Sequence, residues 1–383
     1  MSSPDITGAE VKAVLDVLEG SALSLGPSAE GFEREFAQYV GRPFAVSVSS
    51  GTAGLHLCMI AAGVTKGDLV ITTPFSFIAS ANVILYQEAI PVFVDVEETT
   101  GNISPEQACL AIEEVSGPNR SDWLPPGPPN KGRGELRAVL PVHAFGSPAD
   151  MNPLSVAARE NGVVVIEDAC EAVGGEYDKQ KLGSIGDAGV FAFYPNKQMT
   201  TGEGGLVVTG NEDWAALFRS LRNQGRDASD PWLRHSRLGF NYRLDELSAA
   251  LGLAQLRRID TLLERRRMVA NWYTERLDMV DGVSVPREPP FATCMSWFAY
   301  VVRLADGGNR GRLMEHLESV GVPTRPYFEP IHLQSFYRER FGWREGAFPV
   351  AEKLGRSSLA LPFSSVMTEQ QVDHVCAQLV RCL

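Results

Sequence analysis

One lysine in this 383-residue sequence stands where an amine could do covalent chemistry. Lys197 lies in the turn of FAFYPNKQMTTGEGGLVVTG, residues 191–210, between two runs typical of β-strands, 189–194 and 204–209. A lysine at the tip of a buried strand must be desolvated or paired, which suits an amine that forms a Schiff base. A solvated surface lysine is the simpler alternative. The proline, threonines and glycines around the turn favour a ligand site instead, because they supply a bend, hydroxyl donors and close backbone approach.

Two further groups of residues could cooperate with that lysine. Glu167 and Asp168 follow the apolar run VVVI directly, and an acidic pair at the end of a buried strand is costly unless a cation or a hydrogen bond meets it. Ser50, Gly51 and Thr52 open a helix after another apolar run, so free backbone N–H groups and the helix dipole would point where a phosphate could bind. The alternatives are a Mg²⁺ site at the acidic pair and an ordinary helix cap at Ser50. A lysine and a phosphate cradle together favour an organic cation such as a pyridinium.

The composition places these residues in a globular protein that acts on small molecules. The net charge of -12 argues against a general binder of nucleic acid or anionic membranes, because both require a positive field. The six cysteines lack metal-ligand spacing, and the sequence starts without the basic and apolar regions of a signal peptide. It also has no run of about 18 apolar residues that could span a membrane. We therefore expect a cytoplasmic protein with reduced thiols, no metal site, no nucleic-acid partner and no membrane association.

The elements that must position the lysine form a regular alternation. Seven apolar, β-branched runs alternate with stretches of helical periodicity, which predicts an α/β fold with a mostly parallel sheet covered by helices on both faces. In such sheets ligands bind at the carboxyl ends of the strands, where Lys197, Asp168 and Ser50 fall. Before the first run, a helix predicted over residues 4–19 carries apolar residues that are expected to pack. The runs cover residues 45–50, 69–75, 91–96, 137–146, 163–170, 189–194 and 204–210.

The pattern changes within a long helical region, residues 238–277. We place there the boundary between a large domain, residues 1–255, and a smaller C-terminal α/β domain, residues 256–383. The arginines that follow the boundary are expected to form a solvated helix face: Arg257, Arg258 and Arg265 to Arg267.

Several motifs, in this order and at this spacing, resemble the DegT/DnrJ/EryC1/StrS family of sugar aminotransferases. They run through nearly the whole chain and include SSGTAGLHL, PFSFIASANVI, EDACEAVGG, FAFYPNKQMTTGEGGLVVT and GFNYRLDELSAALGLAQL. The resemblance implies a fold type I enzyme that uses pyridoxal 5′-phosphate, with a seven-stranded, mostly parallel sheet between helices in its large domain. It also implies a homodimer with shared active sites.

The resemblance assigns roles to the residues that the sequence singled out. Lys197 would form the Schiff base with the cofactor and then act as acid and base in the proton shift, while Asp168 would pair with the pyridine nitrogen. A nearby carboxylate favours the protonated nitrogen, which lets the ring accept the charge of a carbanion. The residues that would hold the phosphate and stack on the ring follow the first two strands: Ser50, Gly51, Thr52 and Phe77.

Further matches concern the surroundings of the cofactor. Asn241, in the NYR motif, matches a residue that reaches the cofactor phosphate of the neighbouring subunit. Arg243 and Arg325 could contact a substrate carboxylate or phosphate, or form structural ion pairs. Glu171 stands where the family often has Gln or His, near the 3-hydroxyl of the cofactor, and Glu there is similar to the perosamine-synthase-like branch. Tyr194 replaces the His of the SFHxxK form and is assigned no catalytic role.

The activity that the resemblance implies is transfer of an amino group from L-glutamate to the keto carbon of a nucleotide-linked sugar. TTGEGG after the lysine is more similar to members that aminate C-4 than to those that aminate C-3, which often read GDGG, so a 4-keto-6-deoxyhexose is favoured. The alternatives are amination at C-3 or of a cyclitol, formation of an aminobenzoate, and a non-catalytic regulatory protein that binds the cofactor. The 3-dehydratase branch of the family has histidine in place of the lysine, so Lys197 argues against it.

Overall fold

A seven-stranded sheet forms the centre of the computed structural model, which describes residues 2–383 except 118–119, 128–133, 232 and 306–308. Its strands are β1 (Phe44–Val48), β2 (Leu69–Thr72), β3 (Ile90–Phe93), β4 (Leu136–Val139), β5 (Val164–Asp168), β8 (Ala188–Ala192) and β9 (Gly205–Thr209). Their spatial order is β1-β9-β8-β5-β4-β2-β3, and among these strands only β9 runs antiparallel to its neighbours. Each strand overlaps one of the seven apolar runs, which confirms the predicted mostly parallel α/β sheet.

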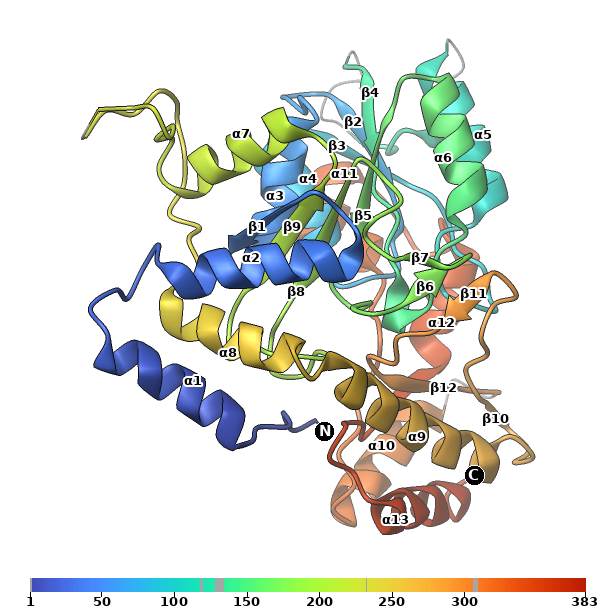
Figure 1. The fold of residues 1–383 in the computed structure, drawn as a ribbon. Helices are drawn as coiled ribbons and strands as arrows, with labels where there is room; N and C mark the ends of the chain where they lie inside the picture. The colour runs from blue at the N-terminus through green and yellow to red at the C-terminus, as the bar shows by residue number, and fades with distance from the viewer. Residues whose placement is uncertain (1, 118–119, 128–133, 232, 306–308) are drawn as a thin grey trace.

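Helices cover both faces of this sheet (Figure 1). One face is packed by α3 (Gly51–Ala61), α4 (Ala79–Tyr86) and α7 (Glu212–Arg222). The other face is packed by α2 (Pro27–Val40), α5 (Pro105–Ser116) and α6 (Met151–Glu160). Outside α2 lies α8 (Glu246–Leu256), and outside α8 lies α1 (Gly8–Glu19). Because both faces are covered, the strands read as continuous apolar runs rather than alternating ones. Among the described residues, no helix combines the length and the apolar character that crossing a bilayer requires.

The C-terminal part of the chain builds a core of its own. Its small antiparallel sheet joins β10 (Val283–Ser284), β12 (Tyr300–Leu304) and β13 (Ser358–Leu361). Its helices are α9 (Ile259–Leu277), α10 (Arg310–Ser319), α11 (Ser335–Phe341), α12 (Pro349–Ser357) and α13 (Glu369–Val380). Apolar side chains of α9, α10 and α13 pack against that sheet. The predicted boundary between residues 255 and 256 lies at the end of α8, just before α9 begins, and it stays a prediction.

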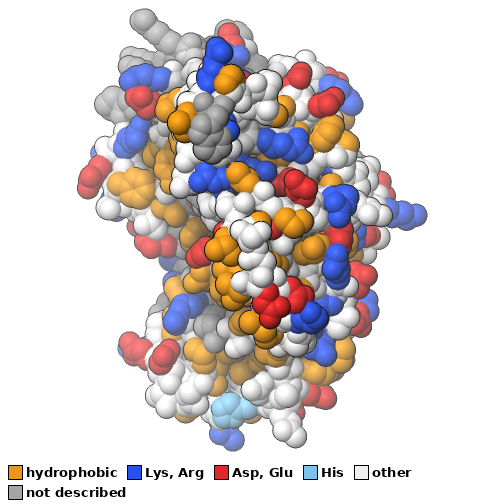
Figure 2. All heavy atoms as spheres, turned by 60° about the vertical axis from the view of Figure 1, so that its left-hand side comes forward, with side chains coloured by type: hydrophobic (Ala, Val, Ile, Leu, Met, Phe, Trp, Pro, Cys, Tyr) orange, Lys and Arg blue, Asp and Glu red, His pale blue; other side chains and the backbone are white. Residues whose placement is uncertain are grey.

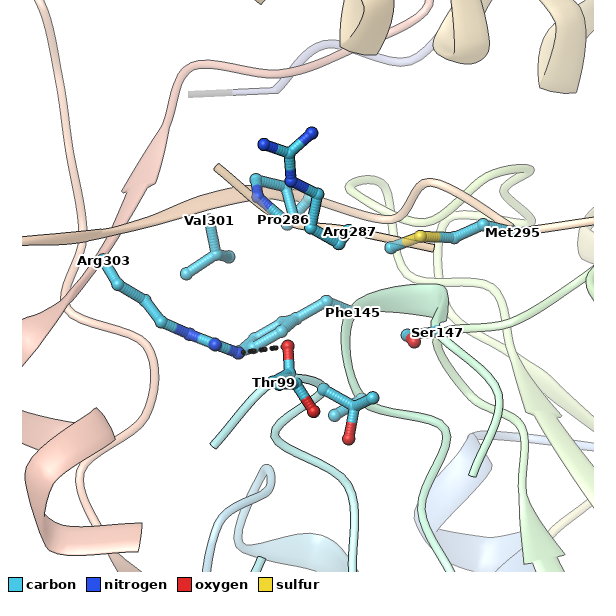
Figure 3. A pocket seen from close by; sticks show the side chains of 11 residues that line it. Thr99, Phe145, Ser147, Pro286, Arg287, Met295, Val301 and Arg303 are labelled. Atoms are coloured by element: carbon cyan, nitrogen blue, oxygen red, sulfur yellow. Dashed lines mark hydrogen bonds between the residues drawn. The ribbon is translucent and has the colours of Figure 1, made fainter. Parts of the chain in front are cut away.

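Contacts near the end of β3 fasten the C-terminal part to the large sheet. Asp95 accepts hydrogen bonds of 2.9 Å from the backbone N–H groups of Val350 and Ala351, and so caps α12. Arg303 on β12 donates to the carbonyl oxygen of Thr99 at 3.0 Å, beside a cavity of about 20 Å³ (Figure 3). That volume has room for little more than a water molecule, so the cavity is not a ligand site. Short strands also link the C-terminal part to the large domain: β11 (Ala292–Cys294) pairs with β6 (Glu176–Tyr177), which pairs with β7 (Gln180–Lys181).

The first helix does not bury the apolar face that its sequence predicts. Thr7 caps α1 and forms a capping box with Glu10. Asp5 and Glu10 bind the guanidinium of Arg258 at 2.8 and 2.9 Å, so Arg258 is paired rather than solvated as expected. The side of α1 that carries Glu10 faces α8, whose Gln255 donates to the Glu10 carboxylate at 2.8 Å. Most of the apolar side chains of the helix predicted over residues 4–19 are exposed in this subunit: Ile6 45%, Val11 52%, Leu15 51% and Leu18 56%.

Candidate active site

The carboxyl ends of the parallel strands meet at a cavity of about 540 Å³. β5 ends at Asp168, β1 leads into Ser50, and β8 leads into the turn that carries Lys197. Because these strands run in the same direction, their carboxyl ends lie at one edge of the sheet. The cavity is lined by the residues predicted to surround the cofactor within one subunit: Ser50, Gly51, Thr52, Phe77, Asp168, Glu171 and Lys197.

Lys197 stands in the turn between β8 and β9. Its backbone N–H donates to the carbonyl oxygen of Tyr194 at 2.9 Å, which closes the turn. Its ammonium lies 3.3 Å from a carboxylate oxygen of Glu171 and 4.0 Å from the centre of the Phe298 ring. The Lys197 side chain is only 13% exposed. An anion and an aromatic face therefore hold the amine inside the cavity.

Glu167, the first member of the acidic pair, does not face the cavity, because successive residues of a strand point to opposite sides of the sheet. Its carboxylate contacts Nε2 of His143 at 3.0 Å, and both side chains are completely buried. It also accepts hydrogen bonds of 2.6 to 2.7 Å from the backbone N–H groups of Gly183, Ile185 and Gly186. Glu167 and His143 therefore have structural roles. Within the described residues, no group of three or more His, Cys, Asp or Glu side chains is arranged to hold a metal ion.

Asp168 faces the cavity and has neutral partners. The hydroxyl of Ser80 donates to one carboxylate oxygen at 2.7 Å, and the backbone N–H of Cys170 donates to the other at 3.1 Å. Asp168 is 5% exposed and forms no ion pair with the residues that the structure describes. A buried carboxylate without a cation is costly. The site therefore suits a ligand that brings a positive charge to Asp168, and a protonated pyridine nitrogen meets that requirement.

Glu171 lies beside the lysine amine. One carboxylate oxygen faces Lys197, and the other accepts a hydrogen bond from the backbone N–H of Phe145 at 2.9 Å. Burial raises the pKa of the Glu171 carboxyl above its ordinary value, although the Lys197 ammonium and the Phe145 N–H oppose that shift. A carboxyl in this position can accept a hydrogen bond when ionised and donate one when protonated. It suits a place between an amine and the 3-hydroxyl of the cofactor.

The N-terminus of α3 forms another wall of the cavity. The hydroxyl oxygen of Ser50 accepts a hydrogen bond from the backbone N–H of Ala53 at 3.1 Å, so Ser50 is the helix cap. The other N–H groups of the first turn have no partner within the helix and carry the positive end of its dipole. A Cβ at Gly51 would lie 2.7 Å from Sγ of Cys170 and 2.8 Å from Cβ of Ala192, so only glycine lets the helix start this close to the sheet. The geometry fits a phosphate.

The sequence analysis did not single out several residues that line the cavity, and two of them contact the predicted site residues directly. Ser80, which donates to Asp168, lies in the first turn of α4, three positions after Phe77. Its closeness to Phe77 in the sequence could have pointed to it. Phe298 comes from the C-terminal part of the chain, and no motif marks it. Phe77 itself is 62% exposed and lines the cavity mouth with an open ring, as a stacking residue requires.

Three predicted residues do not line the cavity of their own subunit. Asn241 is exposed and pairs through its backbone with Asn223. Arg243 donates to the side-chain oxygens of Asn223 and Gln224 at 2.9 and 2.8 Å, and Arg325 donates to a neighbouring backbone carbonyl oxygen. Neither arginine pairs with a carboxylate among the described residues, so each remains able to bind an anion. The roles of these three residues stay predictions.

The fold and the cavity define an α/β enzyme of the pyridoxal-phosphate class. A desolvated lysine, a carboxylate that requires a cation and an anion cradle converge at the strand ends of its sheet. The profile of the DegT/DnrJ/EryC1/StrS aminotransferase family matches residues 4–380, and the chain belongs to this family. Its members are pyridoxal-phosphate enzymes, which confirms the predicted enzyme class and cofactor.

Individual relatives match over almost their whole length. GDP-perosamine synthase of Caulobacter vibrioides is 35% identical, with 100% of this chain and 98% of that protein covered. The putative pyridoxal phosphate-dependent aminotransferase EpsN of Bacillus subtilis is 33% identical, with 99% and 94% covered. The crystal structure of the aminotransferase TlmJ from Streptoalloteichus hindustanus is similar with a TM-score of 0.86 at 31% identity, with 99% and 97% covered. These similarities confirm the predicted fold class.

Proposed function

We propose that the chain transfers an amino group from L-glutamate to C-4 of a nucleotide-linked 4-keto-6-deoxyhexose. The observation that carries this proposal is the cavity that brings three groups together. The Lys197 amine lies there 3.3 Å from Glu171. The same cavity is lined by the Asp168 carboxylate, which has no cation among the described residues, and by the anion-binding N-terminus of α3. The similarity to a protein named GDP-perosamine synthase supports a nucleotide-linked sugar as the acceptor. Amination at C-3 or of a cyclitol, and a regulatory protein without turnover, are the alternatives.

The chain's own residues divide the chemistry between them. Bound pyridoxal 5′-phosphate supplies a ring that accepts the electron pair released when a proton leaves the substrate carbon. The amine of Lys197 takes that proton and returns it, and the carboxylate of Asp168 keeps the ring nitrogen protonated. Glu171 orients the Lys197 amine through the 3.3 Å contact. The remaining residues hold the phosphate and stack on the ring: Ser50, Gly51, Thr52 and Phe77.

A panel of keto sugars tests the proposed acceptor. We expect turnover with L-glutamate and a UDP-, dTDP- or GDP-linked 4-keto-6-deoxyhexose, with the product carrying its new amine at C-4 by NMR. The matched controls are the 3-keto isomers on the same nucleotides and a keto-cyclitol. Amination of a 3-keto sugar or of the cyclitol alone would contradict the assignment to C-4, and no turnover with any member would favour the regulatory alternative.

We also propose a homodimer with shared active sites. Besides the exposed apolar side chains of α1, the subunit leaves others exposed on the loop between α1 and α2, Leu23 55% and Leu25 52%, and on the loop between α7 and α8, Leu233 72% and Leu238 86%. Figure 2, which brings the side with α1 and α7 forward, shows hydrophobic side chains gathered across the middle of this face. An apolar area of this kind marks an interaction surface. A second copy of the chain would cover it and bring its own Asn241 toward the cavity.

Mixing two inactive variants tests the shared site. Lys197→Ala lacks the amine, and Asn241→Asp would place a negative charge against the cofactor phosphate. If Asn241 acts on the neighbouring subunit, a heterodimer has one site with both defects and one with neither, so activity recovers toward half of wild type per heterodimer. The measurement is amino transfer after subunit exchange, which differently tagged chains demonstrate. If proven heterodimers stay at the sum of their inactive parents, Asn241 acts within its own subunit.

A further inference from the structure

One of the arginines expected to be solvated is instead among the most deeply buried side chains of the chain. Arg266 on α9 is 2% exposed, whereas the side chains of its neighbours Arg265 and Arg267 are 49% and 59% exposed. Each residue of a helix is rotated by about 100° from the previous one, so a run of three arginines must point in three directions. The expectation was therefore wrong for Arg266. The helical spacing offered a signal that the sequence analysis did not use, because Arg266 lies four positions after Leu262 and three before Val269, on the buried face of α9.

The buried guanidinium is held by backbone carbonyl groups rather than by a carboxylate. One nitrogen, Nη2, donates to the carbonyl oxygens of Lys197 at 2.6 Å and Asn196 at 3.2 Å. The other, Nη1, donates to the carbonyl oxygens of Phe298 at 3.0 Å and Trp297 at 3.3 Å. Arg266 forms no ion pair with any described residue, and burial lowers its pKa to about 10. A buried cation without an anion is costly, so its retention here requires a reason.

The two segments that Arg266 joins are the two that meet at the lysine amine. Residues 196–197 carry the lysine, and residues 297–298 carry the aromatic ring whose centre lies 4.0 Å from its ammonium. They come from different parts of the chain, the turn after β8 and the stretch before β12. The planar, five-donor fork of arginine can hold both pairs of carbonyl groups at once, which the single ammonium of a lysine cannot. No other side chain among the described residues donates to the carbonyl oxygen of Lys197.

We propose that Arg266 is a positioning residue that clamps the backbone of Lys197 to that of Phe298, and thereby holds the lysine amine where it captures the cofactor and moves the substrate proton. The inference rests on the proposed role of Lys197. Arg266 touches neither the cavity nor a reacting atom, so its effect passes entirely through the backbone of the lysine turn. Reacting groups displaced by about 1 Å lose rates of the order of 100-fold, which sets the size of the effect to look for.

The variants Arg266→Ala and Arg266→Lys test this role, with Arg267→Ala as the matched control on the same helix. Two rates are measured: covalent capture of pyridoxal 5′-phosphate by the cofactor-free protein, followed by the absorbance of the lysine-bound cofactor, and amino transfer from glutamate. We expect both Arg266 variants to slow capture and to lower kcat by about 10- to 100-fold, with KM for glutamate changed by less than about twofold. Arg267→Ala should match wild type in both rates.

Thermal unfolding separates positioning from a general loss of stability. A merely structural role would lower Tm while each folded molecule captured the cofactor at the wild-type rate. If Arg266→Ala does not fold, Arg266→Lys carries the decision, because it keeps the buried charge but not the fork. Wild-type capture by either folded variant overturns the proposal. Lys197→Ala is included as a separate arm: covalent capture by that variant would refute the role of Lys197 itself, so the two failures are distinguishable.

Discussion

Lys197→Ala is expected to abolish covalent capture of pyridoxal 5′-phosphate and to slow amino transfer by about 10³-fold or more. The substitution removes the amine that bonds to the cofactor, and the same amine is the proposed carrier of the proton. Glu171 and the Phe298 ring remain in place, but neither can supply an amine nitrogen. The measurements are the absorbance of the lysine-bound cofactor after its addition to cofactor-free protein, and single-turnover rates with glutamate.

Lys181→Ala is the matched control for that experiment. Lys181 on β7 pairs with Glu176 at 2.8 Å and does not line the cavity, so its loss should leave both rates at the wild-type value. Thermal unfolding of Lys197→Ala should show a lower Tm than wild type, because the substitution removes the cation beside the buried Glu171 carboxylate and the contact with the Phe298 ring. Normal turnover by a folded Lys197→Ala enzyme would rule out the proposed site.

Asp168→Asn is expected to slow the half-reaction with glutamate by about 10²-fold, the equivalent of a hydrogen bond to a charged group worth about 3 kcal/mol. The change is nearly isosteric, but it removes the negative charge that would hold the ring nitrogen protonated. Folding should suffer little, because the amide oxygen can still accept from the Cys170 N–H and the amide nitrogen can donate to the Ser80 hydroxyl. We therefore expect the free energy of unfolding to change by less than about 1 kcal/mol.

Single-turnover spectroscopy with glutamate measures the half-reaction, and urea unfolding measures stability. Asp187→Asn is the control, since Asp187 accepts a hydrogen bond from the backbone N–H of Val165 at the opposite end of β5 and touches no cavity residue. Its half-reaction should match wild type. A wild-type rate in Asp168→Asn would show that Asp168 is not the partner of the ring nitrogen. Another cation would then have to balance the buried Asp168 carboxylate.

The sequence by itself determined the strands of the sheet and predicted the cofactor residues that line the cavity. Its seven apolar runs overlap the seven strands of the central sheet because a strand buried on both faces must be apolar throughout, which is a local property of the chain. Ser50 and Gly51 could be placed at a helix start for a similar reason, since capping depends on residues three or four positions apart. The rule that parallel strands end at one edge then brought Lys197 and Asp168 together without knowledge of the strand order.

Tertiary structure decided what depends on residues that are distant in the sequence. The sequence does not show which groups the arginines in and before α9 meet: Arg266 reaches the carbonyl groups of two remote segments, and Arg258 is paired with Asp5, just before the first helix. The spacing of α1 gives the direction of its apolar stripe but not which side meets α8, because that depends on Glu10 finding its partners, Gln255 on α8 and Arg258 just beyond it. Helical spacing marks the buried face of α9, on which Arg266 lies, but the groups that its guanidinium meets there are a property of the assembled fold.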